Sequence, residues 1–130
     1  MDAPVFHYLS TIEVPVTDVD AACAWYENML SAHTTWRGEN AAMLRMRTCH
    51  VQIFLVHSDG SDRLQFRSRQ GGVIHSVIDF YCPDLPGMHA WLHEHGVSTT
   101  PLSVHDNGLG GFGFDDPDGN RFGVTNVPFH

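Results

Sequence analysis

The sequence predicts an α+β fold in which one βαβββ module occurs twice. The first observation behind this prediction is an internal repeat, because residues 10–30 align without a gap on residues 76–96. The identical pairs are Ser10 with Ser76, Ile12 with Ile78, Asp18 with Asp84, Ala24 with Ala90 and Trp25 with Trp91. The second observation is the order of elements, since each copy has a strand pattern, an acidic cap, a helix pattern and three further strand patterns.

The third observation is size. A chain of 130 residues, 42% hydrophobic and 17% charged, is expected to form one globular domain over residues 1–130. Within this domain we expect the first module at residues 6–57, a linker at 58–72 and the second module at 73–127.

The first module is predicted to begin with a strand over residues 6–16. Its more apolar face, formed by Ile12, Val14 and Val16, is expected to meet the helix layer, which leaves Glu13 on the opposite face. Thr17 or Asp18 is expected to cap the following helix. A hairpin over 33–37 and 41–47 and a strand over 50–56 complete the module, with Gln52 and Phe54 sharing one face of the last strand.

The second module repeats this plan. A strand over 73–82 is predicted to place His75, Val77, Asp79 and Tyr81 on one face. Asp84 is expected to cap a helix that ends at Gly96, followed by a strand over 97–104. The inner side of the helix is expected to carry Met88, Trp91, Leu92 and His95. A hairpin over 110–115 and 121–126 then closes around the turn Asp116-Pro117-Asp118-Gly119-Asn120.

The segment between the modules, residues 57–72, is polar and rich in glycine and serine. It carries Arg63, Arg67 and Arg69. A solvated linker is the favoured interpretation, because loops are commonly polar without a role in binding. The alternative is a mobile loop whose arginines close over an anionic ligand.

Charge and cysteine usage exclude several classes of protein. The net charge of −8 argues against nucleic acid and against anionic membrane surfaces, whose binding needs clustered Lys and Arg. Three cysteines without CxxC spacing indicate no disulfide framework. No signal peptide pattern opens the chain and no apolar run approaches membrane-spanning length, so a reduced, cytoplasmic setting is expected.

Two stretches carry a resemblance to a known family. FGFDDPDGNRFGV, residues 112–124, resembles the closing hairpin of the vicinal oxygen chelate superfamily, and VPVTDVDAACAWYENML, residues 14–30, resembles its first strand and helix. This superfamily includes glyoxalases, bleomycin-resistance proteins, fosfomycin-modifying enzymes and extradiol dioxygenases. The resemblance implies paired βαβββ modules whose curved mixed sheets enclose a cavity, and often a homodimer.

The resemblance also implies where a metal would be held. Metal-using members place His or Glu ligands at positions that correspond here to Thr11, Gln52, Val77 and Gly123. Val and Gly offer no side-chain donor, and Thr and Gln are weak ligands for Zn, Ni or Fe. We therefore expect the usual metal site to be absent and the protein to be independent of metal.

The inferred faces predict which side chains line the cavity. They are Glu13, Gln52, Phe54, His75, Asp79, Tyr81 and Arg121, joined by Thr125. Glu13 and Asp79 occupy equivalent repeat positions, and two buried carboxylates can bind a cation, share a proton or pair with arginine. Three arginines are candidates for such a pair: Arg45, Arg47 and Arg121. An unusual metal site formed by Glu13, His75 and Asp79 is the remaining alternative.

The expected function is binding of a small molecule, with the ligand sequestered in the cavity of a homodimeric, cytoplasmic protein. The two carboxylates favour a cationic or hydrogen-bond-donating ligand, such as a basic antibiotic or metabolite. The alternative is a metal-dependent lyase, isomerase or dioxygenase that uses the unusual ligand set. A third possibility is a module whose cavity is filled by side chains and that serves only in dimerisation or partner binding.

Overall fold

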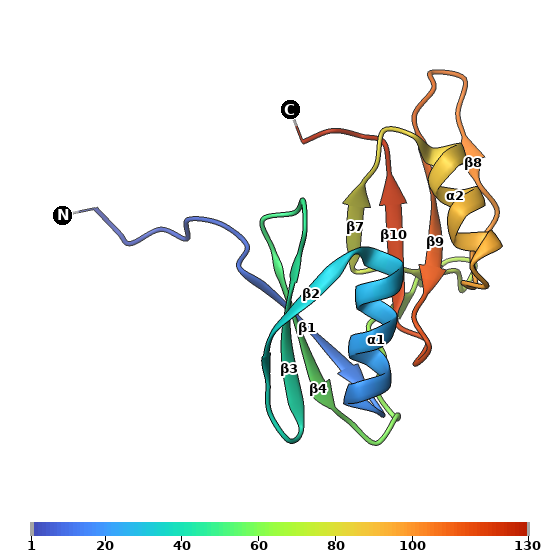
Figure 1. Cartoon of the computed structure of the whole chain (residues 1–130). Coiled ribbons are helices and arrows are strands. Elements are labelled where there is room, and N and C mark those ends of the chain that lie inside the picture. The colour runs from blue at the N-terminus through green and yellow to red at the C-terminus, as the bar shows by residue number, and fades with distance from the viewer. Residues whose placement is uncertain (1, 130) are drawn as a thin grey trace. The chain divides into compact units, whose positions relative to one another are not determined.

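The computed structural model describes residues 2–129 and divides them into two units (Figure 1). The described residues of the first unit are 2–14 and 18–57, and those of the second are 15–17 and 58–129. Each unit contains a four-stranded sheet and one helix. No helix within residues 2–129 is long and apolar enough to cross a membrane.

The first sheet has the strand order β1-β4-β3-β2. These strands are β1 (Thr11–Val16), β4 (Gln52–His57), β3 (Ala41–Met46) and β2 (Ala32–Arg37). Helix α1 (Val19–Leu30) packs against β2, β3 and β4. It begins at Asp18, whose carboxylate accepts a hydrogen bond from Ala21 N at 3.0 Å, and it ends at Ser31 in the left-handed conformation.

The second sheet has the strand order β7-β10-β9-β8. These strands are β7 (Ile78–Tyr81), β10 (Arg121–Thr125), β9 (Gly110–Asp115) and β8 (Ser103–Val104). The β7–β10 pair is parallel and the others are antiparallel, so the sheet is mixed. Helix α2 (Leu85–Glu94), capped by Asp84, packs against β9. The matching strand orders confirm the α+β fold of two βαβββ modules.

Burial follows the predicted alternation in the first strand. Ile12, Val14 and Val16 are buried, whereas Glu13 between them is exposed. The prediction for α2 is mostly wrong, because only Leu92 of the four proposed inner residues is buried, together with Leu85. Met88 and Trp91 remain more than a third exposed, and His95 stacks on the Trp91 ring instead. The physical reason is that α2 packs mainly against β9, because β8 at the outer edge is only two residues long.

Two predicted strands are broken. The strand predicted over 73–82 divides into β6 (Ile74–His75) and β7, because β6 pairs with β5 (Phe66–Arg67) to form a separate hairpin. The strand predicted over 97–104 reduces to β8 and one isolated bridge from Thr99 to Phe114. Pro101 lies between them and has no N–H with which to continue the ladder.

The turn that closes the β9–β10 hairpin is a buried polar network. Asp116 is 4% exposed and Asn120 is fully buried. The Asp116 carboxylate accepts hydrogen bonds from the backbone N and the side-chain Nδ2 of Asn120, at 2.9 and 2.8 Å. Asn120 Nδ2 also donates to Pro15 O at 2.9 Å, and Asn120 Oδ1 accepts from Leu64 N at 2.7 Å. The turn therefore holds two distant backbone segments of the second unit in place.

Candidate functional site

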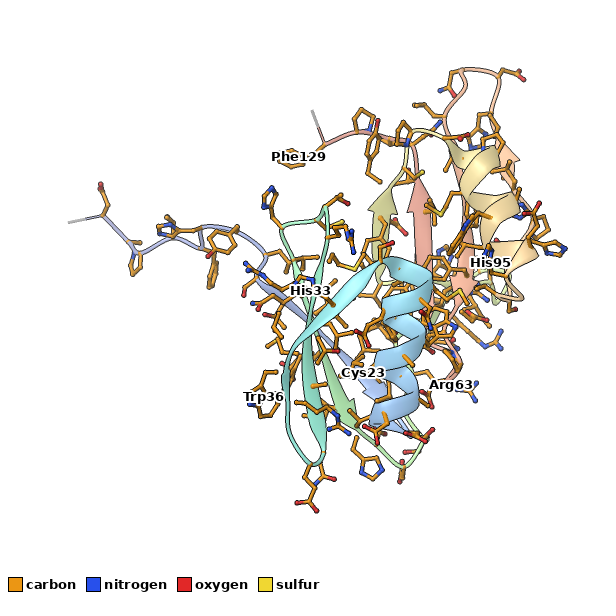
Figure 2. All side chains as sticks on the ribbon, viewed as in Figure 1. Cys23, His33, Trp36, Arg63, His95 and Phe129 are labelled. Atoms are coloured by element: carbon orange, nitrogen blue, oxygen red, sulfur yellow. The ribbon has the colours of Figure 1, made fainter. Side chains whose placement is uncertain are left out.

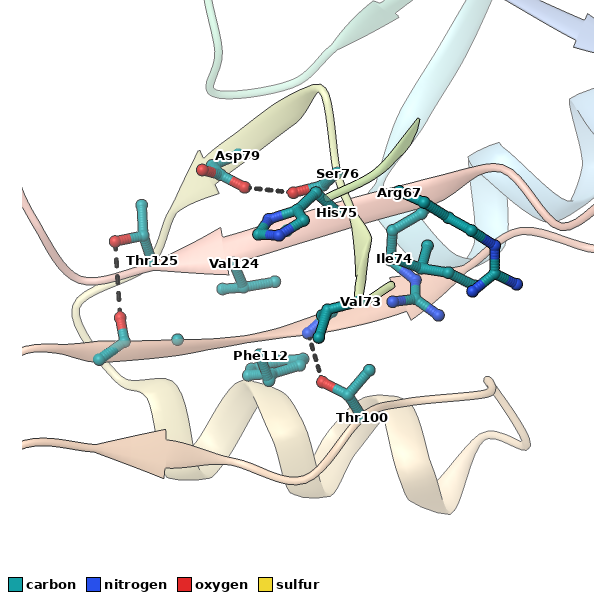
Figure 3. Close-up of a pocket in the computed structure, with 15 residues that line it drawn as sticks. Arg67, Val73, Ile74, His75, Ser76, Asp79, Thr100, Phe112, Val124 and Thr125 are labelled. Carbon is teal, nitrogen blue, oxygen red and sulfur yellow. Dashed lines mark hydrogen bonds between the residues drawn. The ribbon is translucent and has the colours of Figure 1, made fainter. Parts of the chain in front are cut away.

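The second unit contains a hollow of about 730 Å³ (Figure 3). Strands β9 and β10 supply its floor, and the β5–β6 hairpin with the start of β7 supplies a wall. Ligand pockets commonly have volumes of roughly 300–1,000 Å³, so the hollow is large enough for an organic small molecule. Among the seven predicted site residues, His75, Asp79 and Arg121 line it.

Three glycines leave the floor without side chains. Gly113 and Gly123 are register partners across β9 and β10, and Gly111 follows on the same face. A Cβ atom on Gly123 would overlap the Asp79 carboxylate and approach Ser76 Oγ to 2.7 Å. Glycine at this position thus leaves room for the neighbouring carboxylate.

Asp79 is the one acidic side chain among the residues that line this hollow. It is exposed on β7, and Ser76 Oγ donates a hydrogen bond to its Oδ1 at 2.7 Å (Figure 3). Within residues 2–129, no arginine forms an ion pair with Asp79. Its carboxylate therefore has accepting capacity left for a bound molecule.

Arg121 has a partner that the sequence interpretation did not assign. Arg121 Nε lies 2.6 Å from Asp115 Oδ1, and the two residues are register partners that flank the closing turn. Arg121, one of the three arginines considered as partners of the two carboxylates, therefore pairs with Asp115. The signal was present in the sequence, since cross-strand neighbours of opposite charge on either side of a tight turn attract each other.

The segment predicted as a linker contributes one residue, Arg67, to the lining of the hollow, and its Phe66 supports a second lining residue, His75. His75 stacks on Phe66, with ring centroids 5.1 Å apart, and faces the hollow. Arg67 also lines it and donates from Nη1 to Gly72 O at 2.8 Å. Arg63 lies instead against Gly119, so one of the three loop arginines faces the hollow.

The start of the same segment forms a separate turn. Hydrogen bonds from the Ser61 hydroxyl and then from its backbone N–H lower the pKa of Asp59. Asp59 does not line the hollow. The Asp59 carboxylate therefore stabilises the turn through its bonds to Ser61 and takes no part in the candidate site.

The remaining predicted residues are dispersed. Tyr81 lies on β7, is 55% exposed and does not line the hollow. Glu13, Gln52 and Phe54 belong to the first unit, where Phe54 packs near Trp36 with ring centroids 6.4 Å apart. Figure 2 marks Trp36 on the outer strand β2. Gln52 lines a second hollow, which lies within the first unit.

The positions that hold metal in the resembling family do not fit a metal ion here. Val77 and Gly123 have no donor atom, and the Asp79 carboxylate occupies the space in which a side chain at position 123 would begin. Within the described residues, no three His, Cys, Asp or Glu side chains gather as a metal site requires. The unusual set of Glu13, His75 and Asp79 divides between the two units and stays a prediction.

Comparison with known proteins identifies the wider group. The family model described as the Glyoxalase/Bleomycin resistance protein/Dioxygenase superfamily matches residues 7–124. None of the curated proteins compared with the chain matches it significantly.

Solved structures show the same fold at low sequence identity. The genomically encoded fosfomycin resistance protein FosX from Listeria monocytogenes is 18% identical, with 96% of this chain and 97% of that chain covered and a TM-score of 0.75. TnmS3, an antibiotic binding protein from Streptomyces sp. CB03234, is also 18% identical, with 95% and 98% covered and a TM-score of 0.72. A bleomycin-binding protein complexed with bleomycin is 16% identical, with 95% and 100% covered and a TM-score of 0.66.

Proposed function

Because the chain belongs to the glyoxalase/bleomycin resistance protein/dioxygenase superfamily, we propose that it binds an organic small molecule in the hollow of its second unit, without a metal. The observation that carries this proposal is the Asp79 carboxylate, which lies over Gly123 without an arginine partner among the described residues. The mechanism is sequestration, in which no covalent bond of the ligand changes.

The chemistry of the hollow selects the ligand. Asp79 offers an accepting, negatively charged group to a cationic or hydrogen-bond-donating part of the ligand. At Gly113 and Gly123 the ligand would meet the side chains of Arg121 and Asp79, which occupy the space above these two glycines. Two proteins of the same fold are named for binding bleomycin and an antibiotic, which supports an antibiotic or a similar basic metabolite as the ligand class.

The setting of the protein belongs to the same proposal. We propose a homodimer in the cytoplasm, with Glu13 adding negative potential to the binding surface. The three cysteines, Cys23, Cys49 and Cys82, are free, which agrees with a reducing compartment. Sedimentation analysis of the purified protein measures the oligomeric state directly.

An enzyme remains the alternative, because His75 and Asp79 line the same hollow. A lyase, isomerase or dioxygenase would need a metal held by these two residues with Glu13. Elemental analysis of protein purified without an affinity tag or added metal separates the two functions. One transition metal per chain supports the enzyme, whereas no metal and no stabilisation by Ni²⁺, Zn²⁺, Mn²⁺ or Fe²⁺ supports the binding protein.

The binding proposal is tested by calorimetric and thermal titration with bleomycin and a panel of basic aromatic compounds. A ligand present at about 100 times its Kd is expected to stabilise the fold by about 2.7 kcal/mol. Asp79→Asn is expected to weaken binding about tenfold, because it removes a charge-assisted hydrogen bond. Asp62→Asn, at an exposed position outside the hollow, is the matched control. Equal affinity in the wild type and the Asp79→Asn variant would contradict the role of Asp79.

A further inference from the structure

The hollow in the first unit has a different chemical character from that in the second. It has a volume of about 640 Å³ and lies at the end of β3 and the start of β4. Its lining includes Arg45, Arg47, His33 and His50. No Asp or Glu lines it among the residues that the structure describes. This is an uneven distribution in a chain with a net charge of −8.

The basic side chains are brought together by strand register. His33 on β2 is the partner of Arg45 on β3, and Arg45 is the partner of Gln52 on β4. Directly opposite residues share one sheet face, so these three form a row across three strands. Arg47 follows Arg45 by two residues and continues the same side of the chain. Figure 2 labels His33, which lies on β2.

The charges in this row are not compensated within the first unit. The chain has seven arginines and no lysine, and within residues 2–129 two of the arginines form ion pairs, Arg37 with Asp20 and Arg121 with Asp115. Neither Arg45 nor Arg47 forms an ion pair within residues 2–129. An anion bound between Arg45 and Arg47 would be attracted by both guanidinium charges.

We propose that this hollow binds the phosphate or carboxylate group of a small anion. The guanidinium groups of Arg45 and Arg47 present planar pairs of N–H donors that match either oxyanion. The Gln52 amide adds a neutral donor at the end of the row. Tyr8, at the rim, offers an aromatic surface to the organic part of such a ligand. This site lies within the first unit and does not depend on the function proposed for the second.

The test is a titration of the full-length protein with inorganic phosphate at constant ionic strength, followed by NMR of the Arg side-chain Nε–Hε signals. The wild type is expected to bind phosphate in the millimolar range, with the largest shifts at Arg45 and Arg47. Arg45→Gln is expected to weaken binding about tenfold, because a charge-assisted bidentate contact is lost. Arg69→Gln removes the same charge from an exposed position outside both hollows and is the matched control.

The outcomes separate site binding from general attraction. Saturable binding that Arg45→Gln weakens and Arg69→Gln leaves unchanged supports the site. Equal weakening by both variants, or no shift of the Arg45 and Arg47 signals in the folded wild type, overturns it. Phenyl phosphate provides a second arm, because tighter binding than inorganic phosphate assigns the site to an organic anion and equal binding to a free oxyanion. Asp79→Asn is expected to leave phosphate affinity unchanged, so failure here is distinguishable from failure of the ligand proposed for the second unit.

Discussion

On one sheet face of the first unit, His33, Arg45 and Gln52 lie side by side across three strands. In the second unit, the row that runs along Gly113 and Gly123 ends at Asp79. Strand order is the same in both sheets, yet one row carries long basic side chains and the other carries none until its acidic end. The two modules therefore share their strand order, whereas the side chains on the sheet face away from the helix differ between them.

This contrast has a physical origin. The residues facing the helix in each module must fill a core, so Ile12 and Ile78 keep the same identity at equivalent positions. The opposite face does not pack against the helix. Its residues are therefore constrained by contact with a ligand or with water rather than by core packing. Glu13 and Asp79 are both acidic, whereas the neighbouring strands differ: Arg45 lies opposite Gln52 in the first unit, and Gly123 lies opposite Asp79 in the second.

The largest expected effect comes from the buried closing turn of the second unit. Asn120→Ala is expected to lower the free energy of unfolding by about 3 kcal/mol, because Pro15 O, Leu64 N and Asp116 each lose a buried partner. Urea denaturation followed by circular dichroism measures this loss. Asn28→Ala, at an exposed helix position, is the control and is expected to change stability by less than about 0.5 kcal/mol. Similar values for both variants would show that the network contributes little.

The glycines of the second sheet are expected to divide into two kinds. A Cβ atom on Gly110 would overlap the backbone oxygen of Ser103, so Gly110→Ala is expected to destabilise the protein by about 2 kcal/mol. On Gly123 the Cβ atom would meet the movable end of the Asp79 side chain, so Gly123→Ala is expected to cost less than about 1 kcal/mol. Ligand affinity is expected to fall in Gly123→Ala, because the carboxylate is displaced. Thermal unfolding and ligand titration of both variants check the distinction, and equal destabilisation would refute it.

The N-terminal caps of the two helices are a feature that both units share. Asp18 accepts from Ala21 N and Asp84 from Gly87 N, each at 3.0 Å. Asp18→Ala and Asp84→Ala are each expected to cost about 1 kcal/mol, because both caps satisfy one free N–H of a helix start. Chemical denaturation of both variants measures the two values. Glu27→Ala, at an exposed position within α1, is the control. A cost at one helix alone would show that the repeat is not energetically equivalent.

How far the sequence predicted these features depends on the range of the interactions involved. The repeat, the caps and the buried face of β1 follow from local patterns, and they are confirmed. The division of the predicted 73–82 strand follows from pairing between Ile74–His75 and Phe66–Arg67, which no local pattern specifies. The partner of Arg121 depended on cross-strand register, and the buried faces of α2 depended on how much sheet β8 provides.

The candidate site was predicted only in part for the same reason. His75, Asp79 and Arg121 line one hollow, because strand alternation places Asp79 and Arg121 on the open sheet face. The sequence favours a solvated linker for the segment that contains Arg67. The β5–β6 hairpin that places Arg67 at the hollow consists of two-residue strands, which are too short to be recognised within a polar segment. The sequence indicates no role in the site for Gly113, and it marks Gly123 only as a position without a metal donor; the structure shows these two glycines to be register partners on the floor of the hollow.

The smallest expected effects compare one ion pair in each unit. Arg37 and Asp20 in the first unit lie 2.6 Å apart with side chains 35% and 87% exposed, whereas Arg121 and Asp115 in the second lie 2.6 Å apart with 16% and 26% exposed. Water weakens the attraction in the exposed pair, so its coupling energy is expected to be about 0.3 kcal/mol or less, against about 1 kcal/mol for the more buried pair. Double-mutant cycles with Arg37→Gln and Asp20→Asn, and with Arg121→Gln and Asp115→Asn, measure both couplings from urea unfolding. A larger coupling for the exposed pair would mean that helix and strand geometry, rather than burial, decides the strength of these contacts.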